Sequence, residues 1–352
     1  MTPPLSLLFS VLIVVTMTQL VTFVVSQPQV PCYFIFGDAL VDNGNNNALP
    51  TVSKANYQPY GIDFPQGVTG RFTNGRTIAD IIGQLLGFDN FIPPFANVSN
   101  QEINIGVNYG SAGAGIRDET GRHLGDRFTF NKQILNHATI IARLSLLQRN
   151  KTFTQEYLKK CIYVSIIGSD DYINNYLMPN NYPTSRIYTV DQYATALVRQ
   201  YSQQLTALYK LGARKIAVFG LGPLGCTPTE IARFGTGGKP CVDSINNASS
   251  VYNAKLKPLV DELNSNFPDA RFTFINVTIS PSASQQVGPC CQVREDGQCI
   301  PNSIPCPDRN LTIFYDGLHP TEITNMGIAS RSYNAPSPMD ASPYDISSLV
   351  QL

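Results

Sequence analysis

The chain has 352 residues, of which 43% are hydrophobic and 14% are charged. This composition excludes a disordered or coiled-coil chain, because it supplies enough apolar side chains for a large buried core. Lysine plus arginine and aspartate plus glutamate stand at 25 each, so the formal net charge is zero. The balance indicates neither a nucleic-acid partner nor an anionic membrane surface.

Residues 5–25 form an apolar stretch that Thr16, Thr18, Gln19 and Thr22 interrupt and that Ser26 follows. This pattern predicts a secretory signal peptide over residues 1–26. The alternative is an uncleaved membrane anchor, since the run is almost long enough to span a bilayer. The polar interruptions favour cleavage, so we expect a secreted, extracellular protein with no transmembrane span after cleavage. The vacuole and the endoplasmic reticulum are the alternative destinations.

Short apolar runs rich in Ile, Val, Phe and Tyr recur along the chain. They predict buried strands at residues 32–36, 103–109, 162–167, 215–219 and 272–276. Between them, apolar positions recur every three or four residues and predict helices at 76–86, 132–147, 190–211 and 248–267. Strands that alternate with helices predict an α/β fold, in which helices cover both faces of a mostly parallel sheet.

The sequence shows no sign of a boundary between domains. No Ser/Gly linker, charge run or internal repeat interrupts the sequence after residue 26. We therefore expect one domain over residues 27–352. Residues 333–352 contain three prolines and are predicted to be an extended tail.

Eight cysteines are present, and four of them lie together in a loop rich in Pro and Gly: Cys290, Cys291, Cys299 and Cys306. In an oxidising compartment they favour disulfides, whose pairing the sequence leaves open. A zinc site is the alternative, but neither a Cys-x-x-Cys pair nor a nearby histidine supports it. We expect no metal and no cofactor.

Five Asn-x-Ser/Thr tripeptides are candidate glycosylation sites for a chain that enters the secretory pathway. Each tripeptide is weak evidence alone, because several occur by chance in a chain of this length. The asparagines are Asn97, Asn150, Asn247, Asn276 and Asn310.

Four short blocks of small and polar residues either follow a predicted strand or precede a helix. In an open parallel sheet, the loops that leave the carboxyl ends of strands gather at one edge and form the ligand site. The blocks are Gly37-Asp38-Ala39-Leu40, the small-residue loop 108–115, Gly168-Ser169-Asp170-Asp171 and Asp316-Gly317-Leu318-His319-Pro320.

These four blocks, in this order, resemble the GDSL esterase/lipase family of the SGNH hydrolase superfamily, in particular its large plant branch. Residues 69–76 and 220–226 are also similar to stretches typical of that branch, and the resemblance covers nearly the whole chain after residue 26. The resemblance implies an SGNH-hydrolase-like, flavodoxin-like three-layer sandwich. It also implies activity on carboxylic esters or lipids.

The resemblance assigns a role to each block. The family's nucleophile, the serine of Gly-Asp-Ser-Leu, corresponds to Ala39, and the catalytic base and its orienting carboxylate correspond to His319 and Asp316. An imidazole can accept the hydroxyl proton near neutral pH, while the carboxylate fixes its tautomer. The oxyanion hole of the family uses a glycine N–H, matched best by Gly115 with Gly113 as the alternative, and an asparagine that corresponds to Asp170.

Two of these positions depart from the family pattern. Ala39 has no oxygen with which to attack a carbonyl, and removal of a triad serine costs on the order of a million-fold in turnover. An ionised Asp170 donates no hydrogen bond and repels a developing oxyanion, and the loss of one such donor alone costs roughly a hundred- to a thousand-fold.

Two functions follow from these departures. The first is a secreted pseudoenzyme that retains the fold and binds an ester, lipid or glycan, or another secreted protein. The second is an active carboxylic-ester or lipid hydrolase that uses water or an unrecognised nucleophile, with His319 as the base.

We also expect Asp170 and Asp316 to form an ion pair with His319 in preference to a divalent-cation site. His123 and His137 are expected to be structural or surface residues.

Overall fold

The computed structural model describes residues 27–279 and 286–352. The predicted signal peptide at residues 1–26 therefore lies outside the described residues. No helix within the described ranges is long and apolar enough to cross a membrane.

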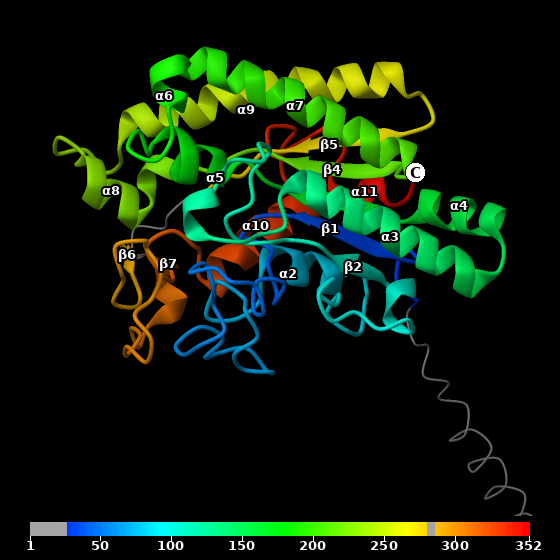
Figure 1. The fold of residues 1–352 in the computed structure, drawn as a ribbon, viewed down its shortest axis with the longest axis horizontal. Helices are drawn as coiled ribbons and strands as arrows, with labels where there is room; N and C mark the ends of the chain where they lie inside the picture. Colours follow the sequence, from blue (N-terminus) through cyan, green and yellow to red (C-terminus); the bar gives the residue numbers. More distant parts are fainter. Residues whose placement is uncertain (1–26, 280–285) are drawn as a thin grey trace, which may run out of the picture.

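A six-stranded sheet forms the centre of the molecule (Figure 1). Its strand order is β2-β1-β3-β4-β5-β8, in which the first five strands pair in parallel and β8 is antiparallel to β5. The bounds are β1 (Tyr33–Gly37), β2 (Gly106–Asn108), β3 (Ile162–Ile166), β4 (Lys215–Phe219), β5 (Arg271–Ile275) and β8 (Ala341–Ser342). A separate parallel pair consists of β6 (Gln286–Pro289) and β7 (Thr312–Phe314).

The order 2-1-3-4-5 is the flavodoxin-like order, and it places a topological switch between β1 and β3. The predicted α/β class and the mostly parallel sheet are confirmed. All five predicted strands are present, although β2 is shorter than predicted because the short 3₁₀ helix η1 (Glu102–Asn104) occupies the start of that run. The prediction of one domain over residues 27–352 stays a prediction.

Helices account for most of the remaining regular structure, and the four predicted helices correspond to α2, α3, α7 and α9. Both α2 and α7 begin with a capping box, in which a threonine and the residue three positions later satisfy each other's backbone N–H groups. The helices are α2 (Ile78–Leu85), α3 (Phe130–Gln148), α4 (Lys151–Lys160), α5 (Ser169–Asp171), α6 (Thr184–Ile187), α7 (Val190–Lys210), α8 (Pro228–Phe234), α9 (Asp243–Asn266), α10 (Glu322–Tyr333) and α11 (Ile346–Leu349), with the shorter turns η2 (Arg122–Leu124), η3 (Tyr172–Tyr176), η4 (Leu224–Cys226) and η5 (Arg309–Leu311).

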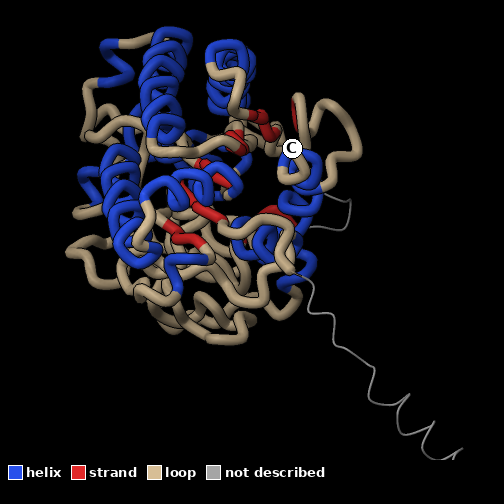
Figure 2. Tube along the Cα trace, turned by 90° about the vertical axis from the view of Figure 1, so that its right-hand side faces the viewer, coloured by secondary structure: helices blue, strands red, loops and turns tan. Residues whose placement is uncertain are grey.

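Side chains of the sheet alternate between two apolar cores. Phe34 and Phe36 of β1 point to one face, where they join residues of α3, α7 and α9. Tyr33 and Ile35 point to the other face, where α2, α10 and α11 cover the sheet. Figure 1 shows α7 and α9 above β4 and β5, and Figure 2 shows the strands in the interior with many of the loops gathered beneath. The structure is therefore a three-layer sandwich.

The predicted extended tail at residues 333–352 is wrong. Residues 341–342 form β8 at the edge of the sheet, and α11 begins at the cap residue Asp345, whose carboxylate accepts the Ser348 N–H at 2.8 Å. Ile346 and Leu349 of this short helix are fully buried in the second core. Burial of apolar side chains against the sheet outweighs the turn signal of the three prolines.

All eight cysteines are paired, which confirms the predicted disulfides and contradicts the zinc alternative. The pairs are Cys32–Cys161, Cys226–Cys241, Cys290–Cys306 and Cys291–Cys299. Cys32 and Cys161 come directly before the neighbouring strands β1 and β3, so this bond joins two strands that lie 129 residues apart in sequence.

An ion pair holds the loop at residues 69–76 against α2. The Arg71 guanidinium contacts the Asp80 carboxylate at 2.7 and 2.8 Å, and both side chains are only 4% exposed. Arg71 also lies 4.1 Å from the ring centre of Phe64. Asp80 in turn caps α2 by accepting the Thr77 N–H. One carboxylate thus fixes both the loop and the start of the helix.

This pair generates a stability prediction. Asp80→Ala leaves the Arg71 charge buried without a partner and removes the cap, so we expect the free energy of unfolding to fall by about 3–5 kcal/mol. The control is Asp261→Ala, which breaks an exposed pair with Lys257 and should change stability by less than about 0.5 kcal/mol. Chemical denaturation measures both values, and equal small losses would contradict a structural role for the buried pair.

Candidate functional site

The first block forms a tight turn where β1 ends. Gly37 pairs with Ile166 of β3, and a Cβ at this position would lie 2.2 Å from the Ile166 carbonyl oxygen, so only glycine fits. The Asp38 carboxylate accepts the Leu40 N–H at 3.0 Å, which shapes the turn as expected from the sequence. Ala39 is presented beyond the end of the strand, and its methyl group lies at the wall of a pocket.

The third block occupies the corresponding place at the end of β3. Gly168 precedes α5, and Asp170 and Asp171 follow in its single turn. Asp170 lines the same pocket as Ala39, and the side-chain amide of Asn174 donates a hydrogen bond to its carboxyl group. Asp171 points away from the pocket and accepts hydrogen bonds from the Ile116 and Arg117 N–H groups at 2.7 and 3.1 Å. Asp170 therefore contributes to the pocket, whereas Asp171 holds the backbone at Ile116 and Arg117.

The second block follows β2 and contains both candidate oxyanion glycines. A Cβ at Gly115 would lie 2.5 Å from a side-chain carbon of Thr120 and 2.6 Å from Asp171, so Gly115 packs against those two residues. The backbone N–H of Gly113 is instead directed at the Asp170 carboxyl group and lowers its pKa. The Gly113 N–H therefore influences Asp170, whereas Gly115 packs beside Asp171, and the oxyanion role of either glycine stays a prediction.

The fourth block follows β7 and carries the Asp-His pair. Nδ1 of His319 lies 2.8 and 3.0 Å from the two Asp316 carboxylate oxygens. The same carboxylate accepts the backbone N–H groups of Leu318 and His319 and the hydroxyl of Tyr60, the last at 2.6 Å. With Nδ1 held by Asp316, Nε2 of His319 is left for the pocket, which the imidazole lines.

Charges around His319 favour its protonated form. Burial would lower the pKa of His319, but the Asp316 carboxylate, its hydrogen bond and the carboxylate of Asp170 together raise it above its usual value of 6.5. The other two histidines behave differently: burial lowers the pKa of His137 to about 3, and burial with two arginines lowers that of His123. His137 lies among aromatic rings of the first core, and His123 contacts Tyr182.

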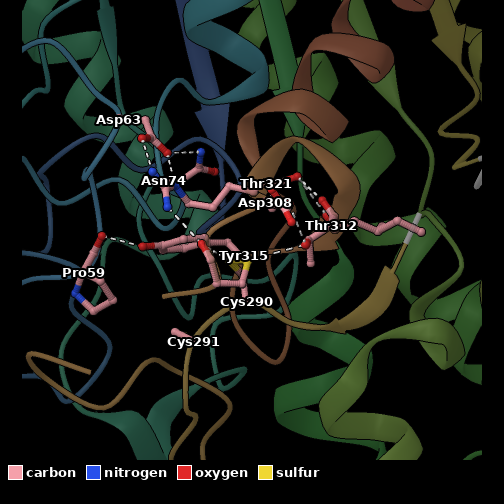
Figure 3. Close-up of a disulfide and its surroundings, with 12 residues drawn as sticks. Pro59, Asp63, Asn74, Cys290, Cys291, Asp308, Thr312, Tyr315 and Thr321 are labelled. Carbon is pink, nitrogen blue, oxygen red and sulfur yellow. Dashed lines mark hydrogen bonds and ion pairs between the residues drawn. A yellow bond between two sulfur atoms is a disulfide. The ribbon is translucent and has the colours of Figure 1, made fainter. Parts of the chain in front are cut away.

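The loops beneath the site connect distant parts of the chain. Tyr315, next to Asp316, donates a hydrogen bond to the Pro59 carbonyl at 2.5 Å, and the Cys290–Cys306 disulfide lies beside it (Figure 3). Asn74 bridges this region, because its amide donates to Asp63 and its carbonyl accepts the Glu322 N–H at the start of α10. The ring of Phe72 lies 5.0 Å from that of His319.

A pocket at the carboxyl ends of β1, β3, β4 and β5 brings these groups together. Its polar lining includes Asp38, Ser169, Asp170, Thr227 and His319. The rest of the wall is mainly apolar and comes from α2, α10 and the loops after the strands: Leu40, Ile78, Ile166, Ile167, Ile173, Leu221, Leu224, Val277, Ile279, Leu318 and Ile328. An apolar pocket with a few convergent polar groups is the usual form of a small-molecule site.

Two carboxyl groups in the pocket influence each other. Burial and the neighbouring Asp170 raise the pKa of Asp38 well above its usual range. Burial also raises the pKa of Asp170, although Asn174, His319 and Gly113 oppose this shift. Two like charges in a desolvated site cannot both form easily, so Asp38 is the group that holds its proton.

The expected ion pair of His319 with both aspartates is only partly present. Asp316 contacts the imidazole directly, whereas no nitrogen–oxygen contact within 4.0 Å joins His319 to Asp170 in the described structure. Asp170 acts on the imidazole at longer range. Across residues 27–279 and 286–352, no group of three His, Cys, Asp or Glu side chains is arranged to hold a metal ion.

Four of the five glycosylation candidates, Asn97, Asn150, Asn247 and Asn310, have exposed side chains, and Asn276 is partly exposed. The Asn150 carbonyl caps α4 by accepting the Phe153 N–H at 2.9 Å.

Sequence reasoning missed Tyr60, and it included Ser169 in a site block without giving it a role. Tyr60 binds Asp316 from 256 positions earlier in the chain, and no local pattern connects the two. Ser169 lines the pocket beside Asp170, and its hydroxyl has no hydrogen-bond partner in the described part of the chain. The Thr227 hydroxyl, by contrast, donates to the Leu224 carbonyl at 2.9 Å.

His319 and Asp316 have the geometry of a base with its orienting carboxylate, and position 39, which lines the same pocket, carries a methyl group. A general base within reach of a hydroxyl and a set of N–H donors around the oxyanion are the two requirements of acyl transfer by a serine. Of the base and the hydroxyl nucleophile, only the candidate base, His319, is present at these positions. The side chain at position 170 accepts a hydrogen bond from Asn174.

Comparison with known proteins identifies the family. The family model for GDSL-like lipase/acylhydrolase matches residues 33–331. The chain is 50% identical to GDSL esterase/lipase At1g29670 of Arabidopsis thaliana, over 93% of each protein, and 48% identical to GDSL esterase/lipase At1g29660 over the same shares. It is 44% identical to GDSL esterase/lipase At5g45670 of the same plant, over 98% of each protein. The chain belongs to the GDSL lipase/acylhydrolase family.

Proposed function

We propose that this protein is a ligand-binding pseudo-hydrolase of the GDSL family, which holds a lipid or ester in its pocket and does not cleave it efficiently. The observation that carries the proposal is Ala39, whose methyl group lines the pocket together with His319. Family membership supports the class of ligand, since the relatives are named esterase/lipase.

Three features of the site support the loss of catalysis. Ala39 offers no nucleophilic oxygen, and that change alone costs on the order of a million-fold in turnover. Asp170 accepts a hydrogen bond from Asn174, and the Gly113 N–H lowers the pKa of its carboxyl group. The Gly113 N–H, which is a candidate donor to an oxyanion, therefore acts on a carboxyl group instead. The raised pKa of His319 keeps the imidazole protonated over more of the pH range, which makes it a poorer base.

A second candidate function is an active ester or lipid hydrolase that uses water or another nucleophile. The intact contact between His319 and Asp316 favours it, because base and orienting carboxylate are both in place. Burial raises the pKa of Asp170, and a protonated Asp170 would donate a hydrogen bond to an oxyanion. The Ser169 hydroxyl in the pocket is the available alternative oxygen.

We also propose entry into the secretory pathway and glycosylation there. Four disulfides support an oxidising compartment, since such bonds are rare in the cytosol. The exposure of four sequon asparagines supports their use as acceptors, as glycosylation needs a surface position. A second secreted protein remains the alternative to a small-molecule ligand.

The first prediction concerns the unaltered protein. We expect its rate of p-nitrophenyl butyrate hydrolysis to equal that of a His319→Ala variant, because the base has no hydroxyl to activate. The release of p-nitrophenol by both proteins at equal concentration measures this. A rate clearly above that of the variant would overturn the pseudo-hydrolase proposal in favour of the second candidate.

Restoration of the missing groups provides a second prediction. Ala39→Ser combined with Asp170→Asn supplies the nucleophile and the amide donor, so we expect esterase activity at least about a thousand-fold above the parent. A fluorophosphonate probe should label the double variant and leave the parent unlabelled. The control adds His319→Ala to the double variant and should abolish both signals. A folded but inactive and unlabelled double variant would show that the chemistry was lost elsewhere.

The third prediction concerns the protonation of His319. In an NMR titration we expect His319 to titrate above 6.5 and above the other two histidines. Asp170→Asn removes a negative charge that stabilises the imidazolium, so the transition should move to lower pH. The control Asp89→Asn changes an exposed carboxylate outside the pocket and should leave the transition in place. An unchanged value in Asp170→Asn would contradict the long-range coupling.

A further inference from the structure

One carboxyl oxygen in the pocket has no role in the fold. Asp38 is 1% exposed, and its Oδ1 atom accepts the Leu40 N–H. Its Oδ2 atom has no hydrogen-bond partner in the described structure, although the residue lines the pocket. A buried polar atom without a partner is costly, so a ligand group that bonds to it would be favoured.

Asp170 and His319 offer complementary hydrogen-bonding groups in the pocket. Asp170 presents a carboxyl group, and His319 presents Nε2, because Nδ1 is bound to Asp316. No nitrogen–oxygen contact within 4.0 Å joins Asp170 to the imidazole among the described residues, and both residues line the same pocket. A hydroxyl group suits this position, because it donates one hydrogen bond and accepts another.

The charges of the site disfavour an anionic head group. Asp316 and His319 neutralise each other, while Asp170 adds a carboxylate on the pocket side. A ligand carboxylate would face this negative charge in a desolvated cavity, where repulsion is strong. The protonation of Asp38, favoured by burial and by Asp170, leaves that group uncharged and able to bond to a neutral partner.

We propose that the pocket selects a long-chain alcohol, with its hydroxyl among Asp38, Asp170 and His319 and its chain along the apolar wall, and that it discriminates against a fatty carboxylate. The inference rests on the proposed function, since it names the head group of the ligand that the pseudo-hydrolase binds. Ile173, Leu221 and Val277 are among the apolar residues available to the chain.

The test compares two probes of equal chain length, octan-1-ol and octanoate, titrated at pH 7 into the purified protein and followed by ligand-observed NMR. We expect the alcohol to bind at least tenfold more tightly than the carboxylate. In Asp170→Asn the new amide can donate to an anion, so the ratio of the two affinities should fall at least tenfold. The control Asp89→Asn should keep the ratio of the parent.

The outcomes separate this inference from the proposed function. Equal binding of both probes, or tighter binding of octanoate by the parent, overturns the inference and leaves the pseudo-hydrolase proposal intact. A preference for the alcohol that persists unchanged in folded Asp170→Asn also overturns it. If neither probe binds the parent, the inference fails, and the pseudo-hydrolase proposal is then decided by the hydrolysis assay alone. The ratio of the two affinities in the unaltered protein tests the inference even if the Asp170→Asn variant does not fold.

Discussion

The hydrogen bonds around the Asp316 carboxylate hold the two ends of the chain at one site. This fully buried group receives the Tyr60 hydroxyl, two backbone N–H groups and the imidazole of His319. The Tyr60 bond joins the region after β1 to the region after β7, and it helps to orient the carboxylate that fixes the tautomer of His319. The Arg71–Asp80 pair and Asn74 support the same region from the other side.

The sheet positions the pocket, and the loops determine its chemistry. The parallel strands β1 and β3 end at the same edge, so the turn after each strand delivers one side chain to the pocket, Ala39 from one and Asp170 from the other. The backbone of the site is therefore that of a hydrolase, with a base in position. In the proposed function, the side chains at these two positions lower the stabilisation of negative charge in the pocket, because Ala39 offers no oxygen and Asp170 presents a carboxyl group. The proposed preference for a neutral head group follows from the same two positions.

Sequence patterns predicted the regular elements well because their signals are local. The runs at 162–167 and 215–219 are short, apolar and bounded by turn residues, and the chain forms β3 and β4 there. Ile346 and Leu349 carried no such signal, because their burial depends on a sheet edge formed by residues 271–275. In the site, the blocks containing Ala39, Asp170 and His319 were identified from their residues, whereas Tyr60 and the orientation of the Gly113 N–H depend on contacts across the fold.

The hydrogen bonds that hold Asp316 in place have an evolutionary consequence. Its bonds to Tyr60 and to two backbone N–H groups stabilise the folded chain whether or not a reaction takes place. Natural selection for folding alone would therefore retain this aspartate in any family member that lost catalysis, whereas an alanine at position 39 still packs in a buried apolar cluster. A surviving Asp-x-x-His signature is thus weak evidence of enzymatic competence, and the side chain after Gly-Asp is the more informative marker.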